Sequence, residues 1–401
     1  MKTALILLFS LAAITVSGQK NIQWRGTDRT GVYNETGLLK SWPAEGPTLL
    51  WSYDGLGKGH SSVAIASDKI YLTGVTDSTG YICVLDLKGK LLNRKEYGQE
   101  WNKGDNGPRG TVTLNDGKLY LISGLGCLYC FDQATLDVIW KKDLLKEYNA
   151  SNIKFGFTES PLIVGDKIIA TPGGKENNVV ALNKKTGELI WSCPGEGAPS
   201  AYCSPLYIKD QQVPLIVTIT ASHTIGINAE TGLKVWSFAN KNLTSVNGNT
   251  PLYFDNMLFC TYGSEEGSIM FRLTNGGRSI EQAWSSSDIN NSMGGMVKVG
   301  DYIYGSAKNK RFWFCADWKT GEFKYKEQGI ALGNIIAADG MLYCYTEKGD
   351  MILAKANPEK FDIVSRFQIT KGTETHFAHP VIYKGVLYVR HGDSLMAYKI
   401  K

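Results

Sequence analysis

The chain has 401 residues, of which 43% are hydrophobic and 20% are charged, and its net charge is +5 at neutral pH. Its 43 Lys and Arg residues are interspersed with 38 Asp and Glu residues, and neither sign forms a long run. Binding of nucleic acid needs clustered cations, so this distribution argues against a nucleic-acid partner.

The first 18 residues have the pattern of a secretory signal peptide. A basic start with Lys2 precedes the apolar run Ala4–Val16, and small residues follow up to Gly18. A run of 13 apolar residues is too short to span a bilayer. We therefore predict cleavage near Gly18, export to the periplasm or the medium, and a mature protein without a transmembrane span.

Residues 19–48 are predicted to form an ordered but irregular lead-in. Turn-forming residues dominate Arg25–Gly31 and Trp42–Pro47, and no periodicity is present. Trp24 and Trp42 are expected to pack this segment. Residues 47–53 then form the first predicted strand, and nothing before them completes a sheet.

A repeated unit fills residues 49–401. Its clearest copies are Asn183–Trp191, Asn228–Trp236 and Asp317–Tyr325, and Asp132–Trp140 is a looser copy. Each copy has Asp or Asn eight residues before the aromatic, and the three clear copies have Thr-Gly between them. Glycine tolerates the positive φ of a tight turn, so each copy predicts two strands joined by such a turn.

The repeat sets the predicted fold class. Its end positions are 41 to 51 residues apart, at Trp51, Asn93, Trp140, Trp191, Trp236, Trp284, Tyr325 and Phe367. Hairpin signals recur inside each unit, and residues 143–149 are at best one or two helical turns. A period in the forties with several strands per unit predicts an all-β propeller in a single domain, residues 49–401.

The two ends of the repeat region complement one another. The last unit begins at Pro380 and stops at Lys401 after its third strand, whereas residues 49–53 are a surplus strand. Pairing these segments would leave no exposed strand edge at the seam. We therefore predict a single eight-bladed β-propeller with four-stranded antiparallel blades, closed by the N- and C-terminal strands.

At these units the chain resembles the quinoprotein-type propeller, whose repeats carry Ala-x-Asp/Asn-x-x-Thr-Gly-x-x-x-Trp. The lead-in motifs Trp24–Gly31 and Glu35–Pro43 are also similar to exported bacterial propellers loosely called polyvinyl alcohol dehydrogenases. The resemblance implies that one aromatic per blade packs against the turn of a neighbouring blade. These girdle residues would be Trp140, Trp191, Trp236, Trp284 and Tyr325.

The resemblance implies two branches of function. One branch binds pyrroloquinoline quinone with calcium and oxidises alcohols or sugars, and the other is non-catalytic, like the outer-membrane assembly lipoprotein that presents its propeller to partners. The chain lacks the adjacent cysteines of the enzymes and the Cys-x-x-Cys-His of an attached haem. No spacing identifies a Glu, Asn and Asp set for calcium.

We therefore predict an exported, monomeric binding or scaffold module, whose partner is a small polar ligand or another envelope protein. The alternative is a pyrroloquinoline quinone-dependent alcohol or sugar dehydrogenase that passes electrons to a separate acceptor. A purely structural envelope protein is a third hypothesis. No catalytic residue and no metal ligand is assigned.

The residues just before the first strand of each blade should converge at one mouth of the central channel. A cation, a carboxylate, histidines and amides there would suit a polar or anionic ligand, and the alternative is that they simply face water. The candidate ligand-binding residues are His60, Arg109, Glu159, Tyr202, Asn249, Asn291, Asn334, His376 and His379. The charged and histidine residues are expected on one arc of this mouth, with the three asparagines opposite.

The eight cysteines are mostly predicted to be buried apolar residues, because they lie inside strand-like runs. Cys127 and Cys130, three residues apart on one predicted strand, should face opposite sides of its sheet. Cys193 and Cys203 lie on neighbouring units, and they are the best candidates for a disulfide.

Overall fold

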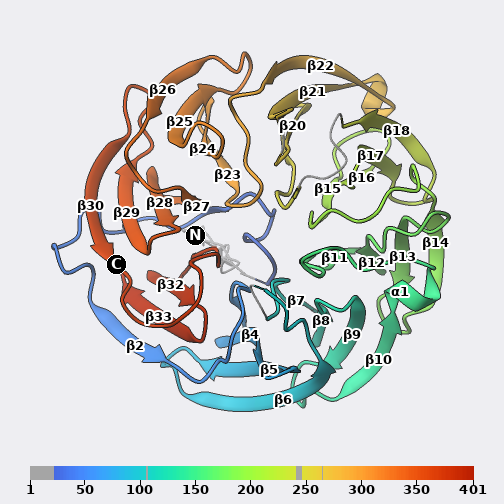
Figure 1. The fold of residues 1–401 in the computed structure, drawn as a ribbon, viewed down its shortest axis with the longest axis horizontal. Helices are drawn as coiled ribbons and strands as arrows, with labels where there is room; N and C mark the ends of the chain where they lie inside the picture. Colours follow the sequence, from blue (N-terminus) through green and yellow to red (C-terminus); the bar gives the residue numbers. More distant parts are fainter. Residues whose placement is uncertain (1–21, 105–106, 241–245, 264) are drawn as a thin grey trace, which may run out of the picture.

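The computed structural model describes residues 22–104, 107–240, 246–263 and 265–401, which form eight β-sheets arranged in a ring (Figure 1). The predicted signal peptide lies outside these residues. The helices of the described residues are α1 (Leu144–Glu147) and a 3-10 turn (Asn275–Gly277), so helix is nearly absent, as predicted. Neither has the length and apolar character that a membrane crossing requires.

Blades 1 to 7 follow one another along the chain, and each runs from its innermost to its outermost strand. Blade 1 contains β3 (Ala64–Ala66), β4 (Lys69–Thr76), β5 (Thr79–Asp86) and β6 (Leu91–Gln99), and blade 2 contains β7 (Thr113–Asn115), β8 (Lys118–Ile122), β9 (Cys127–Asp132) and β10 (Val138–Asp143). Blade 3 contains β11 (Leu162–Val164), β12 (Lys167–Ala170), β13 (Val179–Asn183) and β14 (Leu189–Cys193). Blade 4 contains β15 (Leu206–Ile208), β16 (Leu215–Ile219), β17 (His223–Asn228) and β18 (Lys234–Ala239).

Blades 5 to 7 repeat this order. Blade 5 contains β19 (Leu252–Phe254), β20 (Met257–Thr261), β21 (Ser268–Thr274) and β22 (Ser279–Ser286). Blade 6 contains β23 (Met296–Val299), β24 (Tyr302–Ala307), β25 (Phe312–Asp317) and β26 (Phe323–Glu327). Blade 7 contains β27 (Gly333–Ala338), β28 (Met341–Thr346), β29 (Asp350–Lys355) and β30 (Asp362–Gln368).

Blade 8 is built from both ends of the chain. Its inner strands are β31 (Val381–Tyr383), β32 (Val386–His391) and β33 (Ser394–Lys399), and its outer strand is β2 (Leu49–Tyr53). Trp51 of β2 lies opposite Ala397 of β33. The predicted eight-bladed propeller with shared terminal strands is confirmed.

The lead-in contains a strand that the sequence did not indicate. β1 (Val32–Tyr33) pairs in parallel with β27, the innermost strand of blade 7, and adds a fifth strand to that sheet. Because β1 lies on the channel side of the blade, the residues before it lie inside the ring. Trp42 lies farther along and packs against Tyr343 and Phe367 of the same blade, at ring distances of 5.8 and 5.5 Å.

The apolar cores lie between neighbouring blades. Cys127 packs with the cluster between blades 1 and 2, and Cys130 packs with the cluster between blades 2 and 3, so their predicted opposite orientations are confirmed. All eight cysteines are unpaired. The suggested disulfide between Cys193 and Cys203 is wrong, because Cys193 lies on the outermost strand of blade 3 and Cys203 lies beside the channel before β15.

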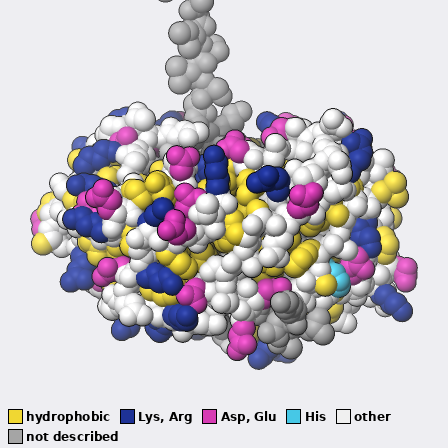
Figure 2. Space-filling model, turned by 90° about the horizontal axis from the view of Figure 1, so that it is seen from above, with side chains coloured by type: hydrophobic (Ala, Val, Ile, Leu, Met, Phe, Trp, Pro, Cys, Tyr) yellow, Lys and Arg dark blue, Asp and Glu magenta, His cyan; other side chains and the backbone are white. Residues whose placement is uncertain are grey.

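Seen edge-on, the molecule is a flattened disc whose side shows apolar side chains among charges of both signs (Figure 2). Exposed aliphatic side chains also occur on outer strands in other parts of the ring. Examples are Leu49, Leu50, Leu91, Leu92, Val138, Ile139, Leu189 and Ile190. No single-sign charge patch is visible on this side, which agrees with the interspersed charges of the sequence.

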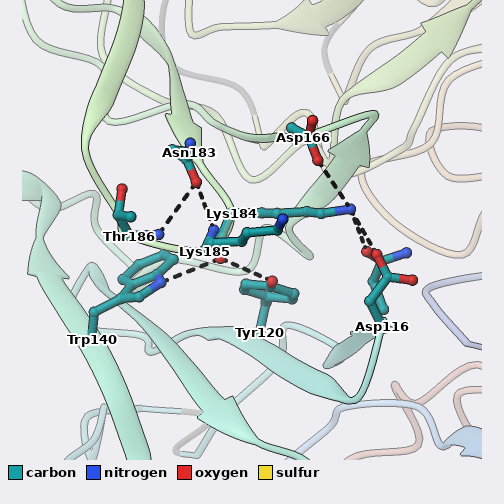
Figure 3. Close-up of polar contacts among 9 residues, drawn as sticks. Asp116, Tyr120, Trp140, Asp166, Asn183, Lys184, Lys185 and Thr186 are labelled. Atoms are coloured by element: carbon teal, nitrogen blue, oxygen red, sulfur yellow. Dashed lines mark hydrogen bonds and ion pairs between the residues drawn. The ribbon is translucent and has the colours of Figure 1, made fainter.

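Neighbouring blades are joined by a recurrent contact between an outer-strand Trp and the next blade's turn. The Trp140 indole N–H donates to the Lys184 carbonyl at 3.3 Å (Figure 3). The same carbonyl accepts from the Tyr120 hydroxyl at 2.9 Å. Equivalent indole bonds join Trp51 to Leu87, Trp191 to Ala229, Trp236 to Gly277 and Trp284 to Trp318.

The Lys184 side chain adds a second connection between blades 2 and 3. The side chain is only 9% exposed, and its ammonium group lies 2.9 Å from the carboxylate of Asp116 and 3.8 Å from that of Asp166 (Figure 3). Both carboxylates are exposed, so water screens this ion pair and its contribution to stability is small.

The turn itself explains the Asp or Asn that begins each repeat. The Asn183 side-chain oxygen accepts from the backbone N–H groups of Lys185 and Thr186 at 2.8 and 3.3 Å, which closes the turn locally. Gly187 then has φ of +74°, and a Cβ at this position would lie 2.9 Å from the Trp140 ring. Glycine is therefore required both by the backbone and by the neighbouring indole.

Replacing Gly187 with Ala tests the indole contact separately from the backbone strain. Gly165 is the matched control, because its φ is also positive, at +60°, but a Cβ there would meet nothing within 4 Å. Both variants carry the left-handed backbone cost of about 1 to 2 kcal/mol. We expect Gly187→Ala to lose a further 1 to 3 kcal/mol or so of unfolding free energy, since it overpacks the blade interface. Equal losses in denaturant unfolding would contradict this role.

Candidate functional site

The lead-in enters the central channel and spans it. The Ile22 carbonyl accepts from the N–H of Leu114 on the inner strand of blade 2, at 2.9 Å. The Gly31 carbonyl accepts from the N–H of Ala337 on the inner strand of blade 7, also at 2.9 Å. We call the segment between these anchors, Trp24–Gly31, the plug.

Arg29 fastens the plug to blades 3 and 4. Its guanidinium donates to the carbonyls of Ser160, Pro161 and Pro205, at 3.2, 2.6 and 3.0 Å. These residues precede the inner strands of the two blades. The side chain is 2% exposed, and burial lowers its pKa to about 10, so it remains charged at neutral pH.

Arg25 fastens the plug to the opposite side of the ring. Its guanidinium donates to the carbonyls of Met296 at 2.5 Å and Ile335 at 3.3 Å, and to Nδ1 of His379 at 3.0 Å. A Cβ on Gly295 would collide with this guanidinium. Arg25 and Arg29 both have positive φ, of 56° and 58°, and their bonds to the ring offset this strained backbone.

A cavity of about 190 Å³ lies at the channel mouth that is formed by the segments before the inner strands. We call it the mouth cavity. Trp24 of the plug belongs to its lining, donates to the Thr250 hydroxyl at 3.2 Å, and packs edge-on against His379 at 4.6 Å. The plug therefore forms the inner end of the mouth cavity.

Four of the predicted site residues line the mouth cavity, and they come from segments before blades 1, 2, 4 and 8. They are His60, Arg109, Tyr202 and His379. Apolar side chains complete the lining, and the largest are Phe155, Phe377 and Met293.

His60 is a buried histidine whose polar atoms lack a partner. It is 5% exposed, and neither ring nitrogen has a well-aligned hydrogen bond to the described residues, although the Thr375 backbone lies close enough to oppose the lowering of its pKa. Burial, reinforced by the charges of Arg390 and Arg109, lowers its pKa to about 3, so the ring is neutral at physiological pH. Unpartnered buried nitrogens are costly, and a ligand or water in the mouth cavity would satisfy them.

His379 is also neutral, and its tautomer is fixed by the plug. The Arg25 guanidinium can only donate, so Nδ1 of His379 accepts and its proton is on Nε2. Burial, together with the Arg25 charge, lowers the pKa of His379 well below its usual value. The ring therefore offers one N–H donor, polarised by a guanidinium behind it.

Tyr202 and Arg109 are held near the cavity by Phe155. The Tyr202 hydroxyl accepts from the Phe155 N–H at 3.3 Å, and Arg109 donates to the Phe155 carbonyl. Tyr202 has φ of 71°, which is unusual for a large side chain and costs of order 1 to 3 kcal/mol. Strained residues of this kind cluster at binding sites, so the backbone conformation of Tyr202 supports the mouth cavity as a candidate binding site.

The three asparagines of the predicted site lie in the channel wall and tie neighbouring loops together. Asn249 donates to the Asn291 carbonyl at 2.7 Å and accepts from the Gly295 N–H at 2.9 Å. Asn334 donates to the Phe377 carbonyl at 2.9 Å. Their amides are engaged within the protein, and none of the three lines the mouth cavity.

Glu159 and His376 also lie outside the lining of the mouth cavity. Glu159 is 1% exposed, and one of its carboxyl oxygens accepts from the Thr171 N–H at 3.1 Å, while the other has no hydrogen-bond partner among the described residues. His376 stacks on His391 at 3.7 Å and bonds the Tyr345 hydroxyl at 2.5 Å. The mouth cavity therefore brings together His60, Arg109, Tyr202 and His379 of the predicted residues, but neither Glu159 nor His376.

A second cavity, of about 590 Å³, lies on the other side of the plug among the turns that follow the inner strands. Its lining mixes charges of both signs, from Asp28, Lys209, Asp210 and Lys298. Across the described part of the chain, no three His, Cys, Asp or Glu side chains are grouped so that they could hold a metal ion.

The mouth cavity does not fit pyrroloquinoline quinone with calcium. Its volume of about 190 Å³ is below the roughly 300 to 1,000 Å³ of pockets that bury a drug-sized ligand. Calcium takes six to eight or so oxygen ligands, usually with carboxylates among them, and the described lining has no Asp, Glu, Asn or Gln.

The plug arginines and the aromatic lining were missed by sequence reasoning. The sequence predicts turns in Trp24–Gly31 and shows a resemblance there, but two Arg residues that are each followed closely by glycine, in a segment without periodicity, could also have suggested side chains reaching into the ring. Phe155, Phe377 and Met293 offered no such signal, because an apolar residue in a loop has no distinctive spacing.

Comparison with known proteins connects this fold to one family. The family model described as outer membrane protein assembly factor BamB matches residues 126–358. BamB from Shewanella oneidensis is 26% identical over 299 residues, which are 71% of this chain and 72% of that protein.

Solved structures share the fold at low identity. The crystal structure of BamB from Moraxella catarrhalis superimposes with a TM-score of 0.65 at 15% identity, over 88% of this chain and 100% of that chain. The quinohemoprotein alcohol dehydrogenase from Comamonas testosteroni superimposes with a TM-score of 0.69 at 11% identity, over 95% of this chain and 80% of that chain.

Glu159 is expected to make stability depend on pH. Burial raises its pKa from 4.5 to about 8, although Thr171 and the Arg29 charge oppose the shift. A raised pKa in the folded state means that its contribution is fully present below pH 4.5 and is lost as the pH rises through about 8. Glu159→Gln keeps the shape of the protonated group and removes the titration.

We therefore expect the unfolding free energy of the wild-type protein to fall, relative to that of Glu159→Gln, between about pH 5 and pH 9. Denaturant unfolding at both pH values measures this difference, and the exposed Glu188→Gln is the control. Parallel pH profiles for wild type and Glu159→Gln would show that the carboxyl is already ionised in the folded protein.

Proposed function

This chain belongs to the family of outer membrane protein assembly factor BamB, and from that premise we propose that it is an exported binding or scaffold module of the cell envelope. Its partners would be envelope proteins and a small ligand at the mouth cavity. The predicted signal peptide supports export, and the name carried by the family supports a role beside proteins of the outer membrane.

The observation that carries the proposal is the occupation of the channel centre by the plug. Arg25 and Arg29 bind it to carbonyls of blades 3, 4, 6 and 7, so the space left at the mouth is small. A quinone-dependent dehydrogenase needs room for a ring cofactor and oxygen ligands for its metal. A module that holds a partner needs a rigid ring with accessible faces, which the closed propeller provides.

The first arm of the test concerns catalysis. Calorimetry with pyrroloquinoline quinone and calcium should give no saturable binding, and dye-linked assays over alcohols and sugars should give no turnover. A quinohemoprotein alcohol dehydrogenase serves as the positive control. Micromolar binding of the quinone together with turnover would overturn the proposal in favour of the dehydrogenase.

The second arm concerns the scaffold role. Cells that lack the chain should contain less assembled outer membrane protein, and expression of the wild-type chain should restore the amount. A variant without residues 1–18, which should remain inside the cell, is the matched control and should not restore it. An unchanged amount of assembled outer membrane protein in the deletion strain would count against this role.

A further inference from the structure

We propose that the mouth cavity binds a small aromatic carboxylate, an anion with one planar ring, through Arg109, His60 and His379. This inference rests on the proposed function, because it names the ligand class of the same site. It is argued from the size, the charge and the unpartnered polar atoms of the cavity.

The volume and the lining of the cavity determine the size and shape of the apolar part of a ligand. A volume of about 190 Å³ corresponds to roughly six water molecules at about 30 Å³ each, which suits one substituted ring. Aromatic side chains line it from the plug and from two loops, in Trp24, Phe155 and Phe377. Flat aromatic walls favour a planar apolar body, because offset and edge-on ring contacts are then available.

The exposure of two apolar side chains at this mouth supports the same conclusion. Phe155 is 38% exposed and Met293 is 45% exposed, and both belong to the lining of the cavity. They extend the apolar lining to the rim of the cavity, where a bound ring would cover them. The thioether of Met293 can adapt to rings with different substituents.

The charges near the cavity determine whether it favours an anionic or a cationic ligand. Arg109 is in the lining, Arg25 bonds to His379 behind the wall, and the Arg390 charge acts on His60. The oxygen atoms named above as partners of Arg25 are backbone carbonyls, which leave its positive charge in place. No carboxylate is present among the described lining residues, and the carboxyl of Glu100, which interacts with the Arg109 charge from outside the lining, has its pKa raised by burial. A positive field in a partly closed cavity favours an anion.

The two histidines supply directed donors for a carboxylate. Nδ1 of His379 is occupied by Arg25, so Nε2–H is the remaining donor of this ring, with a guanidinium behind it. His60 has two unpartnered ring nitrogens and can present an N–H as either tautomer. A carboxylate accepts several hydrogen bonds at once, so it can satisfy both rings and still pair with Arg109.

Calorimetry with benzoate and phenylacetate, each compared with its neutral amide, tests the ligand class on the full mature chain. We expect saturable binding of at least one acid, about tenfold or more tighter than its amide, since a charge-assisted bond is lost in the amide. Arg109→Gln should weaken binding of that acid about tenfold or more, while the matched control Arg366→Gln, on the outer strand β30, should leave it unchanged.

His60→Leu provides a second variant that does not depend on Arg109. Because His60 has no well-aligned hydrogen bond to the described residues, Leu removes at most a weak contact with the Thr375 backbone, and thermal stability should be kept while binding of the acid weakens. Absence of binding by either acid, equal affinity for acid and amide, or unchanged affinity in both Arg109→Gln and His60→Leu would overturn the ligand class.

The proposed function and the ligand class fail in different measurements. If no carboxylate binds while the deletion strain still loses assembled outer membrane protein, only the ligand class is wrong. If the quinone binds with turnover, the scaffold proposal is wrong, whatever the simple carboxylates do.

Discussion

Two buried guanidiniums determine what the inside of this propeller can do. Arg25 and Arg29 lie in the channel and donate to backbone carbonyls of the inner strands or the segments before them, in blades 3, 4, 6 and 7. Ile22 and Gly31 add backbone bonds to blades 2 and 7. These bonds keep the lead-in inside the ring, divide the channel into two cavities, and leave positive charge at its centre. The plug is thus both part of the core and one wall of the candidate site.

The repeated parts of the fold were predictable because they are encoded locally. An Asn such as Asn183 closes its own turn, Gly187 accepts the positive φ, and the following Trp191 is spaced to reach the next blade. The closure of the ring was also predictable, because the repeat region has a surplus strand at its N-terminal end and lacks one strand at its C-terminal end. The path of the lead-in was not predictable, since it depends on carbonyls that are more than a hundred residues away in sequence and that any residue type could present.

The candidate site was predictable only in part, for a related reason. A position near the start of an inner strand places a residue near the channel, but this position alone does not determine whether the side chain points into the channel or along its wall. His60 precedes β3 and lies beside the cavity without a well-aligned hydrogen bond to the described residues, whereas Asn334 lies within β27 and donates to the carbonyl of a neighbouring loop. Amides have both donors and acceptors that backbone groups can satisfy, so a ring of asparagines can serve packing alone.

The central claim is that the lead-in occupies the channel of the folded protein. Hydrogen exchange of the mature chain, followed by mass spectrometry, tests it most directly. The N–H groups of Arg29 and Gly31 bond to the carbonyls of Gly26 and Arg25, inside the ring. The account predicts that peptides covering Trp24–Gly31 exchange as slowly as the inner strand β27. Exchange of these peptides at the rate of an unstructured chain would show that the channel is open, and would contradict the account.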